Sequence, residues 1–192
     1  MRIGVTLRLT KNSNLHFRTI DVAFIAVFSA LYIVMNLTLG PLSFQMLGLP
    51  ILHDFGIFFI LVLVAWITGR LGTSIAVAFI GSAIAILLGA PPLIIGFAVS
   101  AIVFDVLLIA NQHKIRNTFK GLAIPAIAVL LSAYVAGVII GILFMSNGVQ
   151  WAFTIWGGWH FVGGVLAVVV TFPIIAVLER AHVRKLAIKF ED

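Results

Sequence analysis

The sequence predicts an all-α integral membrane protein, a bundle of six transmembrane helices with both termini in the cytoplasm. The composition indicates a membrane protein, because 62% of the 192 residues are hydrophobic and only 9% are charged. A soluble domain with a mean hydropathy of +1.24 would expose more apolar surface than water tolerates. The long apolar runs also lack the alternation of barrel strands, which excludes a closed β-barrel.

Turn signals divide the apolar sequence into spans close to the ~20 residues that cross a hydrocarbon core of ~30 Å. The predicted spans cover about residues 19–39, 51–68, 73–88, 93–110, 121–145 and 153–178. Thr19 or Asp21 is expected to cap the first helix, and Gly40-Pro41 is expected to end it because proline cannot continue a helix. The later breaks fall at residues 69–72, 89–92, 111–120 and 146–150.

The distribution of cations predicts the orientation. All 12 Lys and Arg residues fall on one side of a six-span protein: Arg2, Arg8, Lys11, Arg18, Arg70, Lys114, Arg116, Lys120, Arg180, Arg184, Lys185 and Lys189. The positive-inside rule places that side in the cytoplasm. The domain, residues 19–178, is therefore expected between a cytoplasmic segment, residues 1–18, and a basic cytoplasmic tail, residues 179–192. Topology and anionic lipid account for the net charge of +6, so no nucleic-acid partner is expected.

Residues 1–17 are polar and mildly basic and have no short apolar core, so we expect no cleaved signal peptide. Cysteine is absent, which leaves no thiolate or disulfide chemistry.

Asp105 near the inner surface is expected to be structural and to pair with Arg70 or Lys114. Tyr134 is expected to be a packed residue with a satisfied hydroxyl.

Residues 150–164 hold three of the four tryptophans and one histidine at the start of the last span. At helical spacing Trp156 and His160 share a face with the small residues of the next turns. This pattern predicts a rim of large side chains near the membrane surface, above a space left by the small residues. An aromatic belt at the membrane surface is the alternative, above all for Trp151.

The side opposite the cations carries polar and aromatic groups without any Lys or Arg, which predicts an outward-facing pocket. Its rings and acceptors suit a flat heterocycle, including a cationic one, through stacking and cation–π contacts of about 1–2 kcal/mol per pair. For Asp54 the alternative role is to cap the second helix. For His53 the alternative is an exposed position at the surface. The candidate substrate-binding residues are Tyr32, Asn36, Gln45, His53, Asp54, Asn147, Trp151, Trp156, Trp159 and His160. We expect no metal site and no cofactor.

A second face of the first helix carries a stripe of small residues, Ala23, Ala26 and Ala30. The stripe lies more than 90° around the axis from Tyr32 and Asn36, and a flat stripe lets another helix approach closely in lipid. It is the candidate partner-docking surface. The same spacing recurs at Gly81 and Ala85, Gly137 and Gly141, and Gly163 and Ala167, where chance or internal packing explains it.

The chain resembles a substrate-binding S-component of an energy-coupling factor (ECF) vitamin transporter. The resemblance lies in the short spans, the basic cytoplasmic termini, the sequence from Ala26 to Ala30 and the aromatic loop before the last span. The resemblance implies a multi-pass protein of a prokaryotic plasma membrane whose first helix docks, through Ala26 and Ala30, on a transmembrane T-component driven by two cytoplasmic ATPases. It implies a vitamin or precursor bound beneath the connections at residues 40–50, 89–92 and 146–150. Residues 88–96 are most similar to the thiamine and hydroxymethylpyrimidine type, for which a cationic thiazolium would suit the tryptophans and Asp54. The N-terminal histidine of the nickel and cobalt members is missing.

Enzymes and self-sufficient transporters are the other classes considered. Ser82 lies within an apolar helix and lacks the turn of a rhomboid-like protease, and no phosphate loop or His–Glu metal motif occurs, so no enzyme is expected. A stand-alone channel or transporter, or an intramembrane enzyme, remains the alternative to the capture subunit. The last three spans carry few ionisable groups at mid-depth, whereas an ion path generally needs them.

Overall fold

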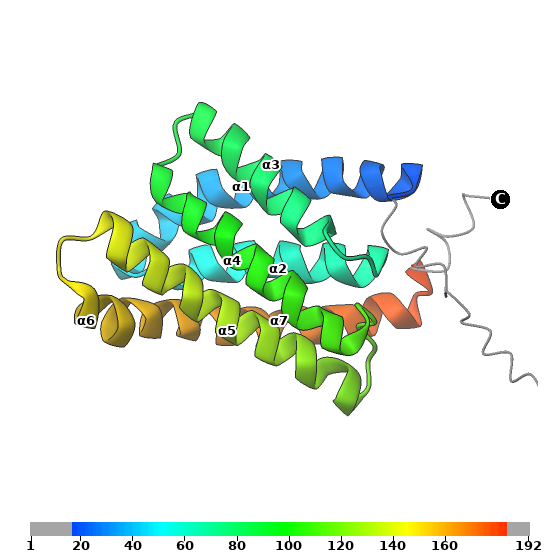
Figure 1. The fold of residues 1–192 in the computed structure, drawn as a ribbon. Helices are drawn as coiled ribbons and strands as arrows, with labels where there is room; N and C mark the ends of the chain where they lie inside the picture. The colour runs from blue at the N-terminus through cyan, green and yellow to red at the C-terminus, as the bar shows by residue number, and fades with distance from the viewer. Residues whose placement is uncertain (1–16, 184–192) are drawn as a thin grey trace, which may run out of the picture.

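The computed structural model describes residues 17–183, and these form an all-α bundle (Figure 1). The helical segments are α1 Thr19–Leu47, α2 Ile51–Thr68, α3 Thr73–Leu87, η2 Pro92–Ile94, α4 Ile95–Leu108, η3 Ile109–Asn111, α5 Phe119–Phe144, α6 Val149–Trp151, η4 Ala152–Trp156 and α7 Gly157–Arg180. The last three are continuous, and η4 is a π-helical turn. Five segments are long and apolar enough to cross a membrane, and α3, at 15 residues, is a shorter apolar helix. The chain is a multi-pass membrane protein.

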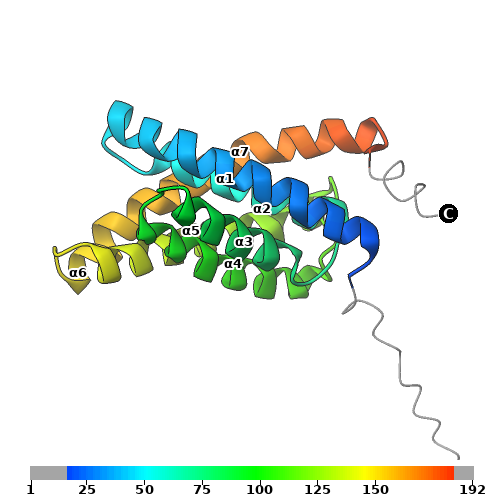
Figure 2. The same cartoon turned by 90° about the horizontal axis from the view of Figure 1, so that it is seen from above.

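The helices lie in two layers, with α1, α2 and α7 in one and α3, α4 and α5 in the other (Figure 2). Around the bundle the packed pairs are α1–α2, α2–α7, α7–α5, α5–α4, α4–α3 and α3–α1. α2 also contacts α3, α4 and α5, and 67% of its most apolar stretch is buried, against 22% for α1. α2 is therefore the central helix, and its almost wholly apolar sequence is typical of a helix enclosed on all sides.

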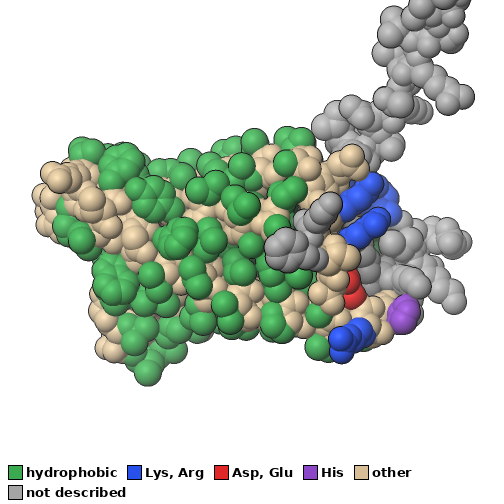
Figure 3. Space-filling view, turned by 90° about the horizontal axis from the view of Figure 1, so that it is seen from below, with side chains coloured by type: hydrophobic (Ala, Val, Ile, Leu, Met, Phe, Trp, Pro, Cys, Tyr) green, Lys and Arg blue, Asp and Glu red, His purple; other side chains and the backbone are tan. Residues whose placement is uncertain are grey.

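Most polar residues of α1 lie on its buried face, and large apolar side chains cover its exposed face. The buried face of α1 consists of Asp21, Ile25, Ser29, Tyr32, Asn36, Gly40 and Ser43. Exposed apolar side chains such as Val27 and Val34 cover the opposite face, and the flank of the bundle that Figure 3 shows is largely hydrophobic. Water would not tolerate this arrangement, but lipid favours it, because polar groups must find partners inside the protein.

The first helix is longer than the sequence predicted. It continues through Pro41 to Leu47 and ends at Gly48, which adopts a left-handed φ of 65° and donates its N–H to the carbonyl of Phe44. Glycine is the usual residue for this helix end, whereas a proline within a helix removes one backbone hydrogen bond and can be accommodated. The Ser43 hydroxyl then fixes the reversal into α2 by donating to the carbonyl of Leu49, 2.5 Å away.

The predicted cap of α1 is partly right. Asp21 is the third helical residue, and its carboxylate accepts a hydrogen bond of 2.8 Å from the backbone N–H of Arg18. Its Oδ2 also lies 2.8 Å from Nε of Arg70.

Asp105 is buried, accepts a 2.7 Å hydrogen bond from the backbone N–H of Gly72 and lies 3.4 Å from His113 Nε2. The partners of Asp105 are thus the backbone N–H of Gly72 and the ring of His113, which differ from the two cations predicted for it.

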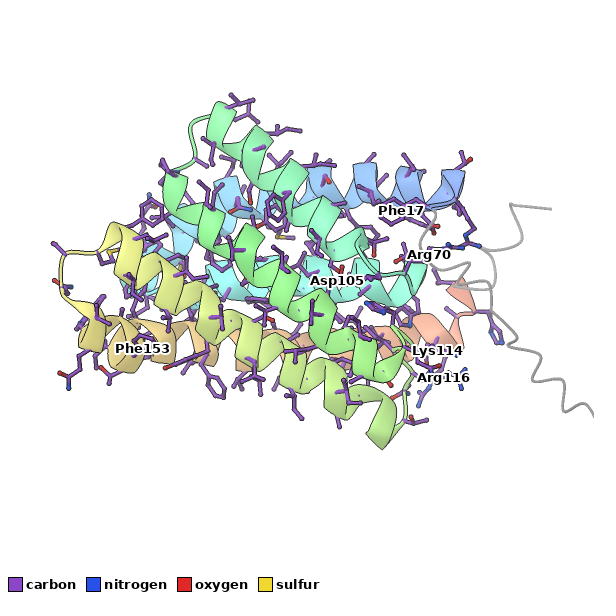
Figure 4. All side chains as sticks on the ribbon, in the orientation of Figure 1. Phe17, Arg70, Asp105, Lys114, Arg116 and Phe153 are labelled. Atoms are coloured by element: carbon purple, nitrogen blue, oxygen red, sulfur yellow. The ribbon has the colours of Figure 1, made fainter. Side chains whose placement is uncertain are left out.

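Cations of the described residues gather at one end of the bundle (Figure 3), where Figure 4 labels Arg70, Lys114 and Arg116. The described chain also begins and ends there, at the start of α1 and the end of α7 (Figure 1). Six of the cations that predicted the orientation lie outside the described residues, together with most of the two predicted terminal segments: Arg2, Arg8, Lys11, Arg184, Lys185 and Lys189.

Candidate functional site: a cavity at one end of the bundle

A cavity of about 370 Å³ lies at the end of the bundle opposite the cations. Figure 4 labels Phe153 at that end. The lining comes from the second half of α1, the start of α2, the connection between α3 and α4, and the residue that follows α5. The lining residues are Asn36, Leu37, Gly40, Pro41, Phe44, His53, Gly89, Ala90, Pro91, Leu93, Ile94 and Met145. The volume is within the range of about 300–1,000 Å³ typical of small-molecule sites.

Two buried side chains, Asn36 and His53, provide the polar part of the wall. The amide nitrogen of Asn36 donates to the carbonyl of Tyr32 at 2.9 Å, and its Oδ1 lies 2.9 Å from His53 Nε2. Because the Asn36 oxygen can only accept, Nε2 of His53 must be the donor. His53 is thereby held between α1 and the ring of Phe97, whose centre is 4.8 Å from its own.

A second buried polar pair stands behind this wall. Asp54 Oδ1 accepts a 2.7 Å hydrogen bond from Nδ1 of His160 and so joins α2 to α7. Both side chains are enclosed, with relative exposures of 0% and 1%. Asp54 does not cap α2, because its carboxylate is turned to α7 and Pro50 is the residue at the cap position. His160 Nε2 and Asp54 Oδ2 are buried without a hydrogen-bond partner among the described residues.

Two glycines allow this pair to form. A Cβ added to Gly163 would lie 2.5 Å from Cβ of Asp54, and one added to Gly137 would lie 2.7 Å from three atoms of the His160 side chain. Both distances are shorter than van der Waals contact. The small residues at these positions therefore pack helices inside the bundle, as the sequence alternative of internal packing proposed.

An aromatic stack adjoins the cavity. The ring of Trp156 lies 6.3 Å from Phe44, a lining residue, and 5.3 Å from Trp151, with interplanar angles of 20° in both pairs. The π-helical turn at residues 152–156 brings the two tryptophans together, since an i→i+5 turn puts side chains five positions apart on the same side. Trp156 also contacts the ring of His160 edge-on, with the two ring centres 5.6 Å apart. The stack connects the end of α1 to the start of α7.

The structure brings together most of the predicted site residues, but not as one lining. Asn36 and His53 line the cavity. Tyr32, Asp54, Trp151, Trp156 and His160 form the layer that holds these two and Phe44 in place. Gln45, Asn147 and Trp159 are exposed and are not among the lining residues.

Phe44 and Phe97 are the functional candidates that the sequence did not single out. Phe44 lies in a segment expected to be loop, and Phe97 lies in an apolar span where nothing in the pattern separates it from its neighbours. Phe97 is fully buried and contacts His53, Phe58 and His160. Phe97 thus links the lining residue His53 to His160 in the layer behind the cavity.

The predicted docking stripe is exposed. Ala23, Ala26 and Ala30 all lie on the outer face of α1, away from the buried Tyr32 and Asn36. By contrast, Gly81 and Ala85, which have the same spacing, are buried inside the bundle.

Comparison with protein-family models, with curated proteins and with solved structures gives no match to this chain.

Proposed function

We propose that this protein is the substrate-capture subunit, or S-component, of an ECF-type importer for a vitamin or vitamin precursor, with a thiamine-related compound favoured. The observation that carries the proposal is the cavity of about 370 Å³ whose wall is formed by the second half of α1, the start of α2, the connection between α3 and α4 and the residue that follows α5. Two buried polar side chains within an otherwise apolar wall are typical of a site that orients a small ligand.

The position of the cavity gives the proposal its direction. It lies at the end that has no described Lys or Arg, and the positive-inside rule makes that end the outer one. The protein would then capture its ligand at the outer surface of a prokaryotic plasma membrane, with both termini in the cytoplasm. Energy for uptake would come from a transmembrane T-component and two cytoplasmic ATPases on other chains.

The exposed alanine stripe supports docking on the T-component. Ala23, Ala26 and Ala30 leave a shallow surface on the helix that is least enclosed by its own bundle. In lipid, such surfaces let a second helix approach to close van der Waals contact. The polar face of α1 carries the ligand site, so one helix would serve both functions.

The ligand is tested by mass spectrometry of any small molecule that co-purifies with the detergent-solubilised protein, followed by titration of tryptophan fluorescence. Trp156 and Trp151 lie next to the cavity and would report its occupancy. A bound vitamin or precursor supports the capture role. A protein that is empty and insensitive to a vitamin panel would instead favour a stand-alone channel or transporter.

Docking is tested by replacing Ala26 and Ala30 with tryptophan. We expect uptake in cells that contain the partner subunits to be lost, while ligand affinity of the purified variant stays unchanged. Leu31→Trp is the matched control, since Leu31 is also exposed but lies about 100° around the axis from Ala30. Loss of affinity together with uptake in the alanine variants would show that the stripe packs against the protein's own helices.

A further inference from the structure

The wall of the cavity has no charge. None of its lining residues is Asp, Glu, Lys or Arg. Asp54 follows the lining residue His53 in the chain, but its carboxylate is hydrogen bonded to His160 on α7 and is not part of the wall. Among the described residues, no carboxylate is therefore placed in this wall to neutralise a cation.

The two polar side chains of the wall have a defined donor and acceptor pattern. His53 Nε2 donates to Asn36, which leaves Nδ1 of the neutral ring as an acceptor. No hydrogen bond to that nitrogen occurs among the described residues, and the atom is not fully enclosed by the protein. Asn36 uses one amide N–H for the carbonyl of Tyr32 and keeps the other. The wall thus offers an acceptor on His53 and a donor on Asn36, two side chains that are hydrogen bonded to each other.

The rest of the wall is apolar and includes flat groups. The ring of Phe44 and the rings of Pro41 and Pro91 provide surfaces against which a planar molecule can lie. Leu37, Leu93, Ile94 and Met145 supply the aliphatic remainder. A charged ligand in such surroundings loses its hydration without gaining a counter-charge, whereas a neutral ring gains from apolar burial.

We infer that the cavity takes a neutral, flat heterocycle that carries a hydrogen-bond donor beside an acceptor on one edge, and that it discriminates against cationic analogues of the same shape. The inference rests on the proposed capture function and specifies its substrate class. An aminopyrimidine ring has this edge. The cationic thiazolium that the sequence suggested, on the basis of the tryptophans and Asp54, has no partner of opposite charge in the wall.

The test is a titration of tryptophan fluorescence on the purified full-length protein with probes matched in shape. Thiamine is compared with 3-deazathiamine, its neutral isostere in which carbon replaces the thiazolium nitrogen. We expect the neutral compound to bind at least tenfold more tightly. A second pair, 4-amino-5-hydroxymethyl-2-methylpyrimidine and its analogue without the amino group, tests the edge, and we expect at least a tenfold loss for the analogue.

A variant reverses the expected preference. Leu93→Asp adds a carboxylate to the wall and should favour thiamine over 3-deazathiamine, whereas the uncharged control Leu93→Asn should not. Equal or tighter binding of thiamine by the unchanged protein would overturn the inference and leave the capture role standing. Failure of all four probes to bind would also overturn it, and the co-purifying molecule would then decide the capture role separately.

Discussion

Gly163→Ala tests how closely α2 and α7 approach at the Asp54–His160 pair. The new methyl group would lie 2.5 Å from Cβ of Asp54 and 2.9 Å from its Oδ2. Carbon atoms in contact are separated by about 3.5 Å or more, so the two helices must move apart by about 1 Å. That movement would stretch the 2.7 Å bond between Asp54 Oδ1 and His160 Nδ1 beyond the usual range of a hydrogen bond.

The expected loss of stability follows from two opposing effects. A hydrogen bond to a charged group contributes ~1.5–3 kcal/mol, and overpacking of a dense core costs a similar amount. Replacing a helical glycine with alanine recovers up to ~1 kcal/mol. The net destabilisation is about 2–5 kcal/mol, which corresponds to a fall in Tm of roughly 4–20 °C for a chain of this size.

Gly158→Ala is the matched control in the same helix. No atom lies within 4 Å of a Cβ added at Gly158, so this variant should gain helix propensity without steric conflict and melt at or above the wild-type temperature. Thermal unfolding of both variants in one detergent, followed by circular dichroism, gives the comparison. If Gly163→Ala melted as high as Gly158→Ala, the close approach of α2 and α7 would be refuted.

Two further predictions concern the layer behind the cavity. Tyr32→Phe leaves the buried Ser82 hydroxyl without its 3.1 Å partner and should lower stability by about 1 kcal/mol; adding Ser82→Ala should restore part of the loss, and additive losses in a double-mutant thermal cycle would contradict the bond. Trp156→Ala removes a ring that is 8% exposed and stacked with two other rings, so about 3–5 kcal/mol should be lost. Trp159→Ala, at 37% exposure, should cost under ~1 kcal/mol, and equal melting temperatures for the two variants would contradict this distinction.

The helices and the polar side chains near the cavity could be predicted from the sequence because hydrocarbon penalises unpaired polar groups, but the pairs that these side chains form were not predicted. Asn36, His53, Asp54 and His160 stand out within apolar spans for that reason, and the structure brings all four into one connected region. The helix boundaries were less certain at glycine and proline, where local signals compete. Gly48 ends α1 and Pro41 does not.

The apolar part of the site could not be predicted. In a soluble protein an apolar side chain indicates the core, but in a bilayer the exterior is as apolar as the interior. Leu93 in the cavity wall and Ile95 on the outside are therefore indistinguishable by hydropathy. The contact between Trp151 and Trp156 depends on the π-helical turn, for which the sequence carries no recognised signal.

The unequal lengths of the helices affect how the protein sits in its bilayer. The 29 residues of α1 extend about 43 Å and the 15 residues of α3 about 22 Å, whereas the hydrocarbon core is ~30 Å thick. We expect the lipid next to α3 to thin to meet its end, and α1 to tilt or project. The connection after α3 supplies Gly89, Ala90 and Pro91 to the cavity wall. We therefore expect the acyl-chain length of the surrounding lipid to affect one side of the cavity.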